Sequence, residues 1–416
     1  MIKTIKGIIY KIREMSGFAF VILKTKRELI QCVYSEEYSQ FTLSEICENM
    51  SVIVTGEELA DERSRTGFEL RLVSFECLSK PEYEPPVVIN NKEVATSLET
   101  LLDYRPITMR NAKESAIFQI QAGICRGFRK FFDDNGFTEI HSPKIVFSGA
   151  EGGSNIFKLD YFGREAYLTQ SPQFYKQIMV GIFERVYEIA PVFRAEKHDT
   201  SRHINEYTSV DFEMGFIESF RDLMQTETRM LAEILEFLRK NYASEIALLK
   251  ADIPTITEIP KVTFDDGKEM ISKTREITDP YDFEPEEEKL LCEIIKKETD
   301  CDFVFVTHYK SSKRPFYTME SKDNPEVTES FDLLFRGMEI TTGGQRIHDY
   351  NAQIAKMEDR SMNVEAFSSY LMAHKYGLPP HGGLGLGLER FTAKLLNFNN
   401  VRYATMFPRD INRLEP

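Results

Sequence analysis

Short runs of β-branched and aromatic residues dominate the first 80 residues of this 416-residue chain. Such runs are typical of β-strands, and a helical stretch at 43–50 separates the third from the fourth. Prolines at 81, 85 and 86 then interrupt any regular helix or central strand, so the β-rich region is expected to end near residue 82. The five predicted strands cover residues 5–12, 18–23, 29–34, 51–55 and 68–75.

Five strands with a helix after the third match the small Greek-key barrel called the OB-fold, which often binds single-stranded nucleic acid. Residues 1–80 carry 11 basic and 12 acidic side chains, so this barrel is expected to be nearly neutral. Any other five-stranded module would give the same pattern and stays open at this point. We assign 1–82 to the barrel, 83–109 to a linker or hinge, and 110–416 to a second domain.

The second domain begins with apolar residues at helical spacing, which predict a helix over 116–134 that Asn135-Gly136 ends. Strand-like runs then recur too often for a βαβ series, so an α+β domain with a largely antiparallel sheet flanked by helices is favoured. A further helix is expected at 222–241. The predicted strands cover 139–147, 166–169, 185–192 and 209–216.

Residues 243–330 follow no clear period and are expected to form a less regular insertion. They contain an acidic run, 282–288, which we interpret as the solvated start of a helix and to which we assign no chemistry.

The chain carries 52 basic and 66 acidic residues, a formal charge of −14, which argues against a protein that coats nucleic acid through bulk charge but leaves a local basic surface open. Its six cysteines form no Cys-x-x-Cys pair, so we expect reduced thiols and no zinc site. No apolar run approaches the ~18 residues that span a bilayer, and the N-terminus lacks a signal-peptide pattern. We therefore expect a cytoplasmic protein with no membrane partner.

One candidate site follows the apolar run 186–190, where the chain reads Phe193-Arg194-Ala195-Glu196. An arginine that projects from a sheet can form a bidentate pair with a phosphate or carboxylate. The loop that follows contains Arg202 and His203, which could reach a polyphosphate. A solvated hairpin would have the same composition and remains the alternative for this stretch taken alone.

Glycine alternates with leucine in a second stretch, 382–388, which Glu389-Arg390 and a helix at 391–396 follow. A strand with a glycine face lets a flat ligand approach the backbone, and Arg390 at the helix start could meet a phosphate or stack on a base. The glycine spacing loosely resembles a Rossmann fingerprint. No βαβ unit surrounds it and the third glycine is misplaced, so we reject that alternative.

Together these stretches resemble the three motifs of class II aminoacyl-tRNA synthetases. Residues 136–143 resemble the first motif, a helix and strand at the dimer interface, residues 193–196 and their loop the second, and residues 385–390 the third. The OB-like domain resembles that of subclass b, which charges Asp, Asn or Lys. The resemblance covers about 110–416 and implies a class II catalytic domain and a homodimer with Pro143 at its interface.

Residues 170–177 and 343–348 are similar to signatures of the aspartyl-tRNA synthetases, and the run 407–410 to their archaeal and eukaryotic branch. A carboxylate substrate is best held by fixed cations, for which Lys176 and Arg346 are the candidates. Asp211 and Glu151 could hold its ammonium group, and the Glu-Gly-Gly segment at 151–153 resembles a mobile loop that closes over aspartate. The expected aspartate-binding residues are Glu151, Gln173, Lys176, Asp211, Thr342 and Arg346.

Carried over position by position, the resemblance implies that ATP and Mg²⁺ bind beside this pocket. Arg194 would bind the α-phosphate and Arg390 the γ-phosphate, and both would act in catalysis. Glu339 and Thr342 would hold Mg²⁺, with Thr342 standing where a serine is usual. The expected ATP-binding residues are Arg194, Glu196, Arg202, His203, Tyr207, Glu339 and Arg390.

The resemblance implies an aspartate–tRNA ligase that forms aspartyl-adenylate from ATP and L-aspartate and transfers the aspartyl group to tRNA-Asp, with tRNA-Asn left open as a second acceptor. The first domain departs from the family pattern and lacks tryptophan. Phe18, Phe20 and Gln31 are its candidates for anticodon contact, and core packing explains both Phe residues equally well. An asparaginyl-tRNA synthetase, a paralogue with a free acceptor that makes an amide, and a non-catalytic tRNA-binding regulator remain the alternatives.

Overall fold

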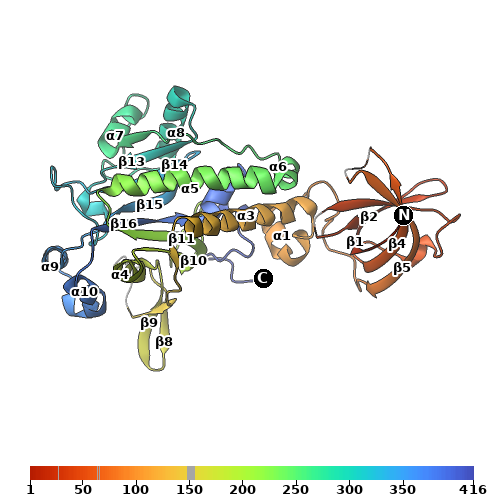
Figure 1. Ribbon diagram of the computed structural model, residues 1–416, viewed down its shortest axis with the longest axis horizontal. Coiled ribbons are helices and arrows are strands. Elements are labelled where there is room, and N and C mark those ends of the chain that lie inside the picture. The colour runs from red at the N-terminus through yellow and green to blue at the C-terminus, as the bar shows by residue number, and fades with distance from the viewer. Residues whose placement is uncertain (27, 63, 65, 148–154) are drawn as a thin grey trace. The chain divides into compact units, whose positions relative to one another are not determined.

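The first 80 residues form a closed barrel of five strands, as the sequence predicts. The structure is a computed structural model that describes residues 1–26, 28–62, 64, 66–147 and 155–416. Neighbouring strands of the barrel run antiparallel except for β3 and β5, which are parallel (Figure 1). The strands are β1 (Ile2–Glu14), β2 (Ala19–Lys24), β3 (Leu29–Tyr34), β4 (Ser51–Ala60) and β5 (Phe68–Ser79).

The stretch 43–50 does not form the expected helix, because only Leu43–Glu45 makes a single 3₁₀ turn. The chain then leaves the helical path, and Asn49 takes a left-handed conformation with φ of 69°. Ile46 and Met50 are buried in the barrel core. The apolar residues that suggested a helix face therefore close the barrel from an irregular segment.

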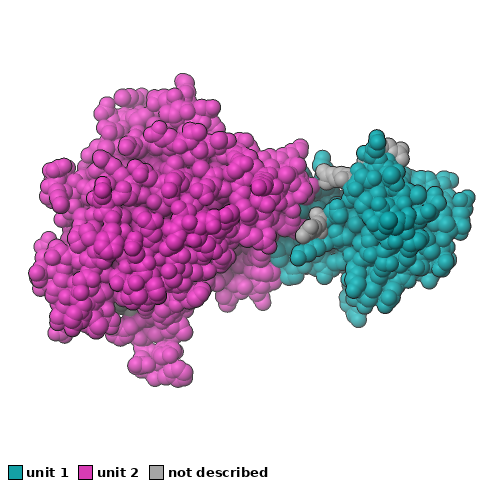
Figure 2. All heavy atoms as spheres, in the orientation of Figure 1, with its two compact units in different colours: residues 1–112 teal, residues 113–416 magenta. Residues whose placement is uncertain are grey.

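The compact unit that contains the barrel extends to residue 112, and residues 113–416 form a second unit (Figure 2). The segment expected as a linker carries two short helices, α1 (Leu98–Asp103) and α2 (Arg105–Thr108). The Tyr10 hydroxyl of β1 donates a hydrogen bond to the Ile89 carbonyl at 3.0 Å. This contact attaches the beginning of the segment to the barrel.

The second unit is built on an eight-stranded sheet with the order β12-β13-β14-β15-β16-β11-β10-β6. Its central pairs are antiparallel, as expected, and only the two edge pairs, β12–β13 and β10–β6, are parallel. The strands are β6 (Thr138–Glu139), β10 (Arg185–Phe193), β11 (Glu206–Gly215), β12 (Lys261–Thr263), β13 (Phe303–Thr307), β14 (Ser330–Phe335), β15 (Met338–Gln345) and β16 (His381–Gly387).

Two long helices, α3 (Ala112–Asp134) and α5 (Phe220–Asn241), lie side by side against this sheet (Figure 1). Glycines in α3 permit the close approach, since a Cβ on Gly127 would lie 3.2 Å from the Ile234 side chain. The other helices of the unit are α4 (Gln173–Phe183), α6 (Ala243–Leu249), α7 (Phe264–Ser272), α8 (Pro285–Thr299), α9 (Tyr350–Asp359), α10 (Ser368–Lys375) and α11 (Leu388–Leu395). Within the described part of the chain, we find no helix with the length and apolar character that crossing a membrane requires.

The prediction of a single strand at 139–147 is wrong, because only the two ends of this stretch pair with other strands. β6 (Thr138–Glu139) pairs with β10, and β7 (Ile145–Val146) joins a separate three-stranded sheet with β8 (Lys158–Tyr161) and β9 (Arg164–Leu168). Between them Pro143 has no N–H to donate, and the Ser142 N–H donates instead to the Glu188 carboxylate at 2.7 Å. Side-chain bonding therefore replaces the ladder in this stretch.

The region 243–330 contains more regular structure than its sequence pattern suggests. Helices α7 and α8 pack over β13 around a core that contains Phe264, Leu291 and Val304. Helix α8 begins in the acidic run, as predicted, but the run is not a solvated surface throughout, because Glu287 and Glu288 are 0 % and 8 % exposed. Both side chains have cationic partners inside the fold.

Glu227 is a fully buried carboxyl group on the face of α5 that packs against the sheet. Neither of its oxygens has a hydrogen-bond partner among the described residues. Burial raises the pKa of Glu227 to about 8, and the neighbouring Thr341 hydroxyl offsets this only in part. The group is therefore protonated in the folded protein near neutral pH.

We expect Glu227→Gln to stabilise the protein by an amount that grows between about pH 4.5 and pH 8. Over this window the unfolded chain releases the Glu227 proton while the folded chain keeps it, so wild-type stability falls by up to about 1.4 kcal/mol per pH unit. Below the window both forms are protonated and the benefit is small. Thermal unfolding of both proteins at pH 5 and pH 7.5 measures this. A Tm difference that does not change with pH would contradict it.

Candidate active site

A cavity of about 420 Å³ opens on the face of the sheet formed by β14, β15, β16 and β11. It brings together stretches that are up to about 220 residues apart, since residues 170–176 and 385–390 both line it. Glu151 lies outside the described residues. The predicted site residues that line the cavity are Gln173, Lys176, Arg194, Glu196, Arg202, His203, Tyr207, Asp211, Glu339, Thr342, Arg346 and Arg390.

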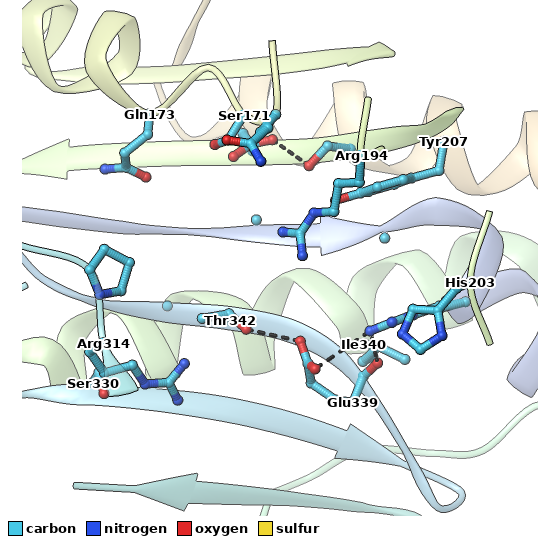
Figure 3. Close-up of a pocket in the computed structure, with 18 of the residues that line it drawn as sticks. Ser171, Gln173, Arg194, His203, Tyr207, Arg314, Ser330, Glu339, Ile340 and Thr342 are labelled. Atoms are coloured by element: carbon cyan, nitrogen blue, oxygen red, sulfur yellow. Dashed lines mark hydrogen bonds and ion pairs between the residues drawn. The ribbon is translucent and has the colours of Figure 1, made fainter. Parts of the chain in front are cut away.

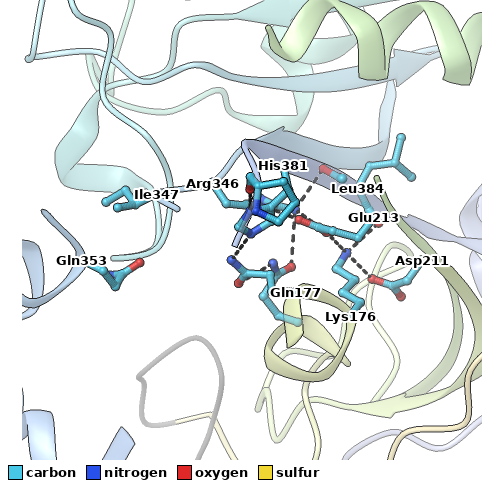
Figure 4. A network of polar contacts seen from close by, with 12 residues as sticks. Lys176, Gln177, Asp211, Glu213, Arg346, Ile347, Gln353, His381 and Leu384 are labelled. Atoms are coloured by element: carbon cyan, nitrogen blue, oxygen red, sulfur yellow. Dashed lines mark hydrogen bonds and ion pairs between the residues drawn. The ribbon is translucent and has the colours of Figure 1, made fainter. Parts of the chain in front are cut away.

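One end of the cavity holds two buried cations. Lys176 of α4 is 2 % exposed, and its Nζ donates to the Asp211 carboxylate at 2.9 Å and to the Leu384 carbonyl at 2.8 Å (Figure 4). Arg346 follows β15 directly and donates through Nε to Glu213 at 2.9 Å. Glu213 also lies 3.4 Å from Lys176 Nζ, so it contacts both cations from behind the cavity.

Glu213 was not among the predicted residues, although it is two positions from Asp211 on β11 and must face the same side of the sheet. It is fully buried and does not line the cavity. Burial alone would raise the pKa of Glu213, but Arg346 and Lys176 hold it below its ordinary value. The carboxylate is therefore ionised, and its contacts orient both cations.

The glycine face of β16 provides space for these carboxylates. Gly383 and Gly385 pair with Glu213 and Asp211 in the antiparallel ladder. A Cβ on Gly383 would lie 2.1 Å from the Phe212 carbonyl oxygen and 2.2 Å from the Glu213 carboxylate, and one on Gly385 would lie 3.0 Å from Asp211. The Gly-Leu alternation was interpreted as room for a ligand, whereas at Gly383 it makes room for a buried anion.

At the other end of the cavity, positive side chains surround Glu339. Figure 3 shows Arg194 and Tyr207 on one wall and Glu339 and Thr342 on the opposite wall. The Thr342 hydroxyl donates to Glu339 at 2.9 Å, and Arg390 Nη1 lies 3.5 Å from the same carboxylate. Burial acts to raise the pKa of Glu339, but Arg390, Thr342 and Arg194 together lower it. An ionised carboxylate therefore lies among groups suited to phosphate.

His203 lies in the loop between β10 and β11, where its Nε2 is 4.0 Å from Glu196. Burial, followed by the nearby Arg390, lowers the pKa of His203 below its ordinary value. The ring is therefore neutral near pH 7 and can act as a hydrogen-bond donor rather than as a fixed charge. On the wall opposite Glu339, Arg194 and Tyr207 approach each other with 6.0 Å between the guanidinium carbon and the ring centre.

Comparison with known proteins identifies the architecture around this cavity. Residues 97–411 match the family model for class II tRNA synthetases (D, K and N). The chain belongs to this family. It is an aminoacyl-tRNA synthetase, as the three motifs predicted.

Curated relatives match the synthetase over nearly its whole length. Aspartate–tRNA(Asp/Asn) ligases of Deinococcus radiodurans and Thermus thermophilus are each 45 % identical to it, with 99 % of this chain and 95 % and 96 % of theirs covered. The aspartate–tRNA(Asp) ligase of Pyrococcus furiosus is 36 % identical, with 99 % and 95 % covered. Among solved structures, the asparaginyl-tRNA synthetase of Pyrococcus horikoshii complexed with asparaginyl-adenylate is similar with a TM-score of 0.92 and 29 % identity, over 100 % of this chain and 96 % of that one.

The structure adds Arg314 to the residues that line the synthetase cavity, with Asp332, which does not line it, as the partner of Arg314 in an ion pair. The Arg314 guanidinium carbon lies 3.9 Å from the Tyr309 ring centre, and Nη2 lies 2.8 Å from Asp332. Asp332 pairs with Thr342 across β14 and β15, and burial raises its pKa to about 6. A lone aspartate within the apolar run of β14 was the sequence signal for this pair.

The remaining predicted contact residues are not among those that line the cavity. Phe18 and Phe20 contact each other edge to face with ring centres 5.2 Å apart, and neither belongs to the barrel core. Gln31 of β3 donates to the Glu69 carboxylate. Pro143 is exposed and is followed by two exposed apolar side chains, Ile145 at 47 % and Phe147 at 75 %.

We expect Gly383→Ala to destabilise the synthetase by about 1–3 kcal/mol, because the new methyl group overlaps the backbone of β11 and the Glu213 carboxylate. The measurement is thermal unfolding. Gly387→Ala in the same strand is the matched control, since its nearest neighbour would be 3.7 Å away, and it should produce a smaller loss. Equal losses in the two variants would show that the close approach at 383 is not the cause.

Proposed function

We propose that this synthetase is an aspartate–tRNA ligase that charges both tRNA-Asp and tRNA-Asn. The observation that supports aspartate is the buried cluster of Lys176, Arg346, Asp211 and Glu213, whose two cations and two anions balance. Apart from its α-carboxylate, which is directed to ATP, aspartate adds a side-chain carboxylate for the cations and an ammonium group for Asp211. The balance is kept when this substrate binds.

Asparagine would not keep this balance, because, apart from the α-carboxylate that reacts with ATP, its ammonium group adds a positive charge and its amide adds none. A surplus charge among groups that are this deeply buried is unfavourable. The similarity to a solved asparaginyl-tRNA synthetase concerns the fold, whereas the charges of the pocket bear on the substrate. They support aspartate.

In the proposed first step, the α-carboxylate of aspartate attacks the α-phosphorus of ATP, and aspartyl-adenylate and pyrophosphate form. The 3′-terminal hydroxyl of the tRNA then attacks the activated carbonyl and releases AMP. No side chain acts as a nucleophile. Arg194 and Arg390 neutralise the charge that develops on the phosphates, and Lys176, Arg346 and Asp211 orient the amino acid.

We also propose that Glu339 and Thr342 hold Mg²⁺, with Asp332 beside them. No group of three or more potential metal ligands is present among the His, Cys, Asp and Glu residues that the structure describes. Mg²⁺ fits such a site, since it keeps several waters and needs only one or two carboxylates besides substrate phosphates. When bound, it would supply a positive charge for the phosphate oxygens.

Two further properties are part of the proposal. The exposed apolar residues 145 and 147, next to Pro143, support a homodimer whose interface includes this stretch. The six cysteines are all free thiols, which supports a reducing compartment such as the cytoplasm.

The dual acceptor specificity is supported by the pattern of similarity. The two relatives named aspartate–tRNA(Asp/Asn) ligases are 45 % identical to this chain, whereas the Pyrococcus furiosus aspartate–tRNA(Asp) ligase is 36 % identical. The acceptor is chosen by contacts to tRNA, which the charges of the amino-acid pocket do not determine.

Arg194→Ala should reduce aspartate-dependent exchange between ATP and pyrophosphate by about 100-fold or more, because one charge that stabilises the transition state is lost. The thermal stability should change little. Arg221→Ala, an exposed arginine at the start of α5, is the control and should keep full activity. Near-normal exchange by the Arg194 variant would contradict the assigned role.

Purified tRNA-Asp and tRNA-Asn should both accept labelled aspartate from the wild-type enzyme, and asparagine should support no exchange. The measurement is aminoacylation of each tRNA, with a tRNA for an unrelated amino acid as the control. Charging of tRNA-Asp alone would restrict the proposal to one acceptor. Exchange with asparagine would indicate an asparaginyl-tRNA synthetase, and exchange without charging of either tRNA would indicate a free acceptor.

A further inference from the structure

Glu288 connects the acidic run of α8 to the wall of the ATP cavity. One of its carboxylate oxygens, Oε2, accepts a hydrogen bond from Arg202 Nη2 and another from the Glu339 backbone N–H at 3.0 Å. The three residues lie in separate parts of the chain, in α8, in the loop between β10 and β11, and at the start of β15. The Glu288 side chain is 10 % exposed and the Arg202 side chain 14 %.

Arg202 lines the cavity, whereas its hydrogen-bond partner Glu288 does not. The Arg202 carbonyl also accepts a long hydrogen bond from Arg390 Nε at 3.4 Å, so the two arginines are linked through the backbone. A guanidinium has five N–H donors. Among the described residues, the Arg202 side chain uses Nη2 for its hydrogen bond to Glu288. The other donors remain available for a ligand.

The second contact of Glu288 is the hydrogen bond that it accepts from the Glu339 backbone N–H. Glu339 approaches Arg390 through both its carbonyl oxygen, at 3.2 Å, and its carboxylate. By accepting from this N–H, Glu288 ties the first residues of β15 to the loop that carries Arg202. A single carboxylate thus sets the distance between two walls of the cavity.

We propose that Glu288 is a positioning residue for the triphosphate of ATP, which holds Arg202 and the backbone of Glu339 in the arrangement that the phosphates require. Its contacts with Arg202 Nη2 and the Glu339 N–H keep the Arg202 guanidinium directed along the cavity wall before ATP binds, so that less ordering is needed on binding. It remains behind Arg202 when the phosphates arrive and touches neither ATP nor the amino acid.

The adjacent Glu287 provides a contrast within the same helix turn. It is fully buried and accepts from Lys268 Nζ and from the Glu284 backbone N–H, both at 2.8 Å. Neither partner lines the cavity. Loss of the Glu287 charge should therefore reduce stability without affecting ATP, which makes Glu287→Gln the matched control.

The test is calorimetric titration of the full-length enzyme with ATP, combined with exchange kinetics in which ATP and aspartate are varied separately. Glu288→Ala should weaken ATP binding and raise the KM for ATP by about tenfold, because the Glu339 N–H loses its partner and Arg202 its orientation. The KM for aspartate should change less than about twofold. Glu288→Gln, which keeps an acceptor oxygen, should restore much of the ATP affinity.

A double variant separates positioning from general stability. Because Glu288 acts in part through Arg202, adding Glu288→Ala to Arg202→Ala should weaken ATP binding by a smaller factor than Glu288→Ala does in the wild type, since only the Glu339 contact is left to lose. Unchanged ATP affinity in Glu288→Ala, equal rises in both KM values, or an equal ATP defect in Glu287→Gln would each overturn the proposal. If Glu288→Ala fails to fold, the same comparisons are made with Glu288→Gln, which should then show a rise of about threefold for ATP alone.

The inference depends on the proposed function only in taking ATP as the substrate. Calorimetry with ATP alone does not depend on which amino acid is activated. A wild-type enzyme that binds ATP but shows no aspartate-dependent exchange would therefore count against the proposed function and leave the role of Glu288 open to the same titration.

Discussion

The burial of two cations and two carboxylates beneath one end of the cavity constrains the structure around it. Lys176 and Arg346 cannot be desolvated singly without a large penalty, and Asp211 and Glu213 compensate them at distances of 2.9 to 3.4 Å. Because the two carboxylates lie on the same face of β11, the neighbouring strand cannot carry side chains there. This requirement explains the glycines of β16. It also explains how β11 and β16 can pair at the centre of the sheet.

The sequence predicted much of this arrangement because its signals are local. The five barrel strands, the helices α3 and α5 and the arginines of the cavity each occupy a short stretch whose composition is informative by itself. Glu213, Asp332 and Glu288 were missed for the opposite reason, since their importance depends on partners far along the chain. Glu288 follows four other acidic residues of the run 282–288, and only the fold distinguishes it from a solvated charge.

Two predictions, a helix at 43–50 and a single strand at 139–147, failed for related reasons. In the first, Ile46 and Met50 are apolar because they close a barrel, and the barrel does not require them to share a helix face. In the second, the Glu188 side chain accepts the hydrogen bond from the Ser142 N–H that a neighbouring strand would otherwise have accepted. Secondary-structure propensity and hydrophobic period describe the conformation that a segment favours by itself. The conformations of these two segments are determined by their tertiary contacts.

Strand β15 joins the two ends of the site, because Glu339 lies near its start and Arg346 follows its last residue. From Thr341 onward its side chains alternate between the layer beneath the sheet, where the buried Thr341 lies beside Glu227, and the cavity, which Thr342 faces. A register shift between Glu339 and Thr341 lets Glu339 line the cavity as well. A deletion or insertion of a single residue within this strand would exchange the two faces and shift the phosphate end against the amino-acid end by about 3.3 Å. Changes of chain length should therefore accumulate in the loops of this enzyme during evolution, while the spacing from Glu339 to Arg346 stays constant.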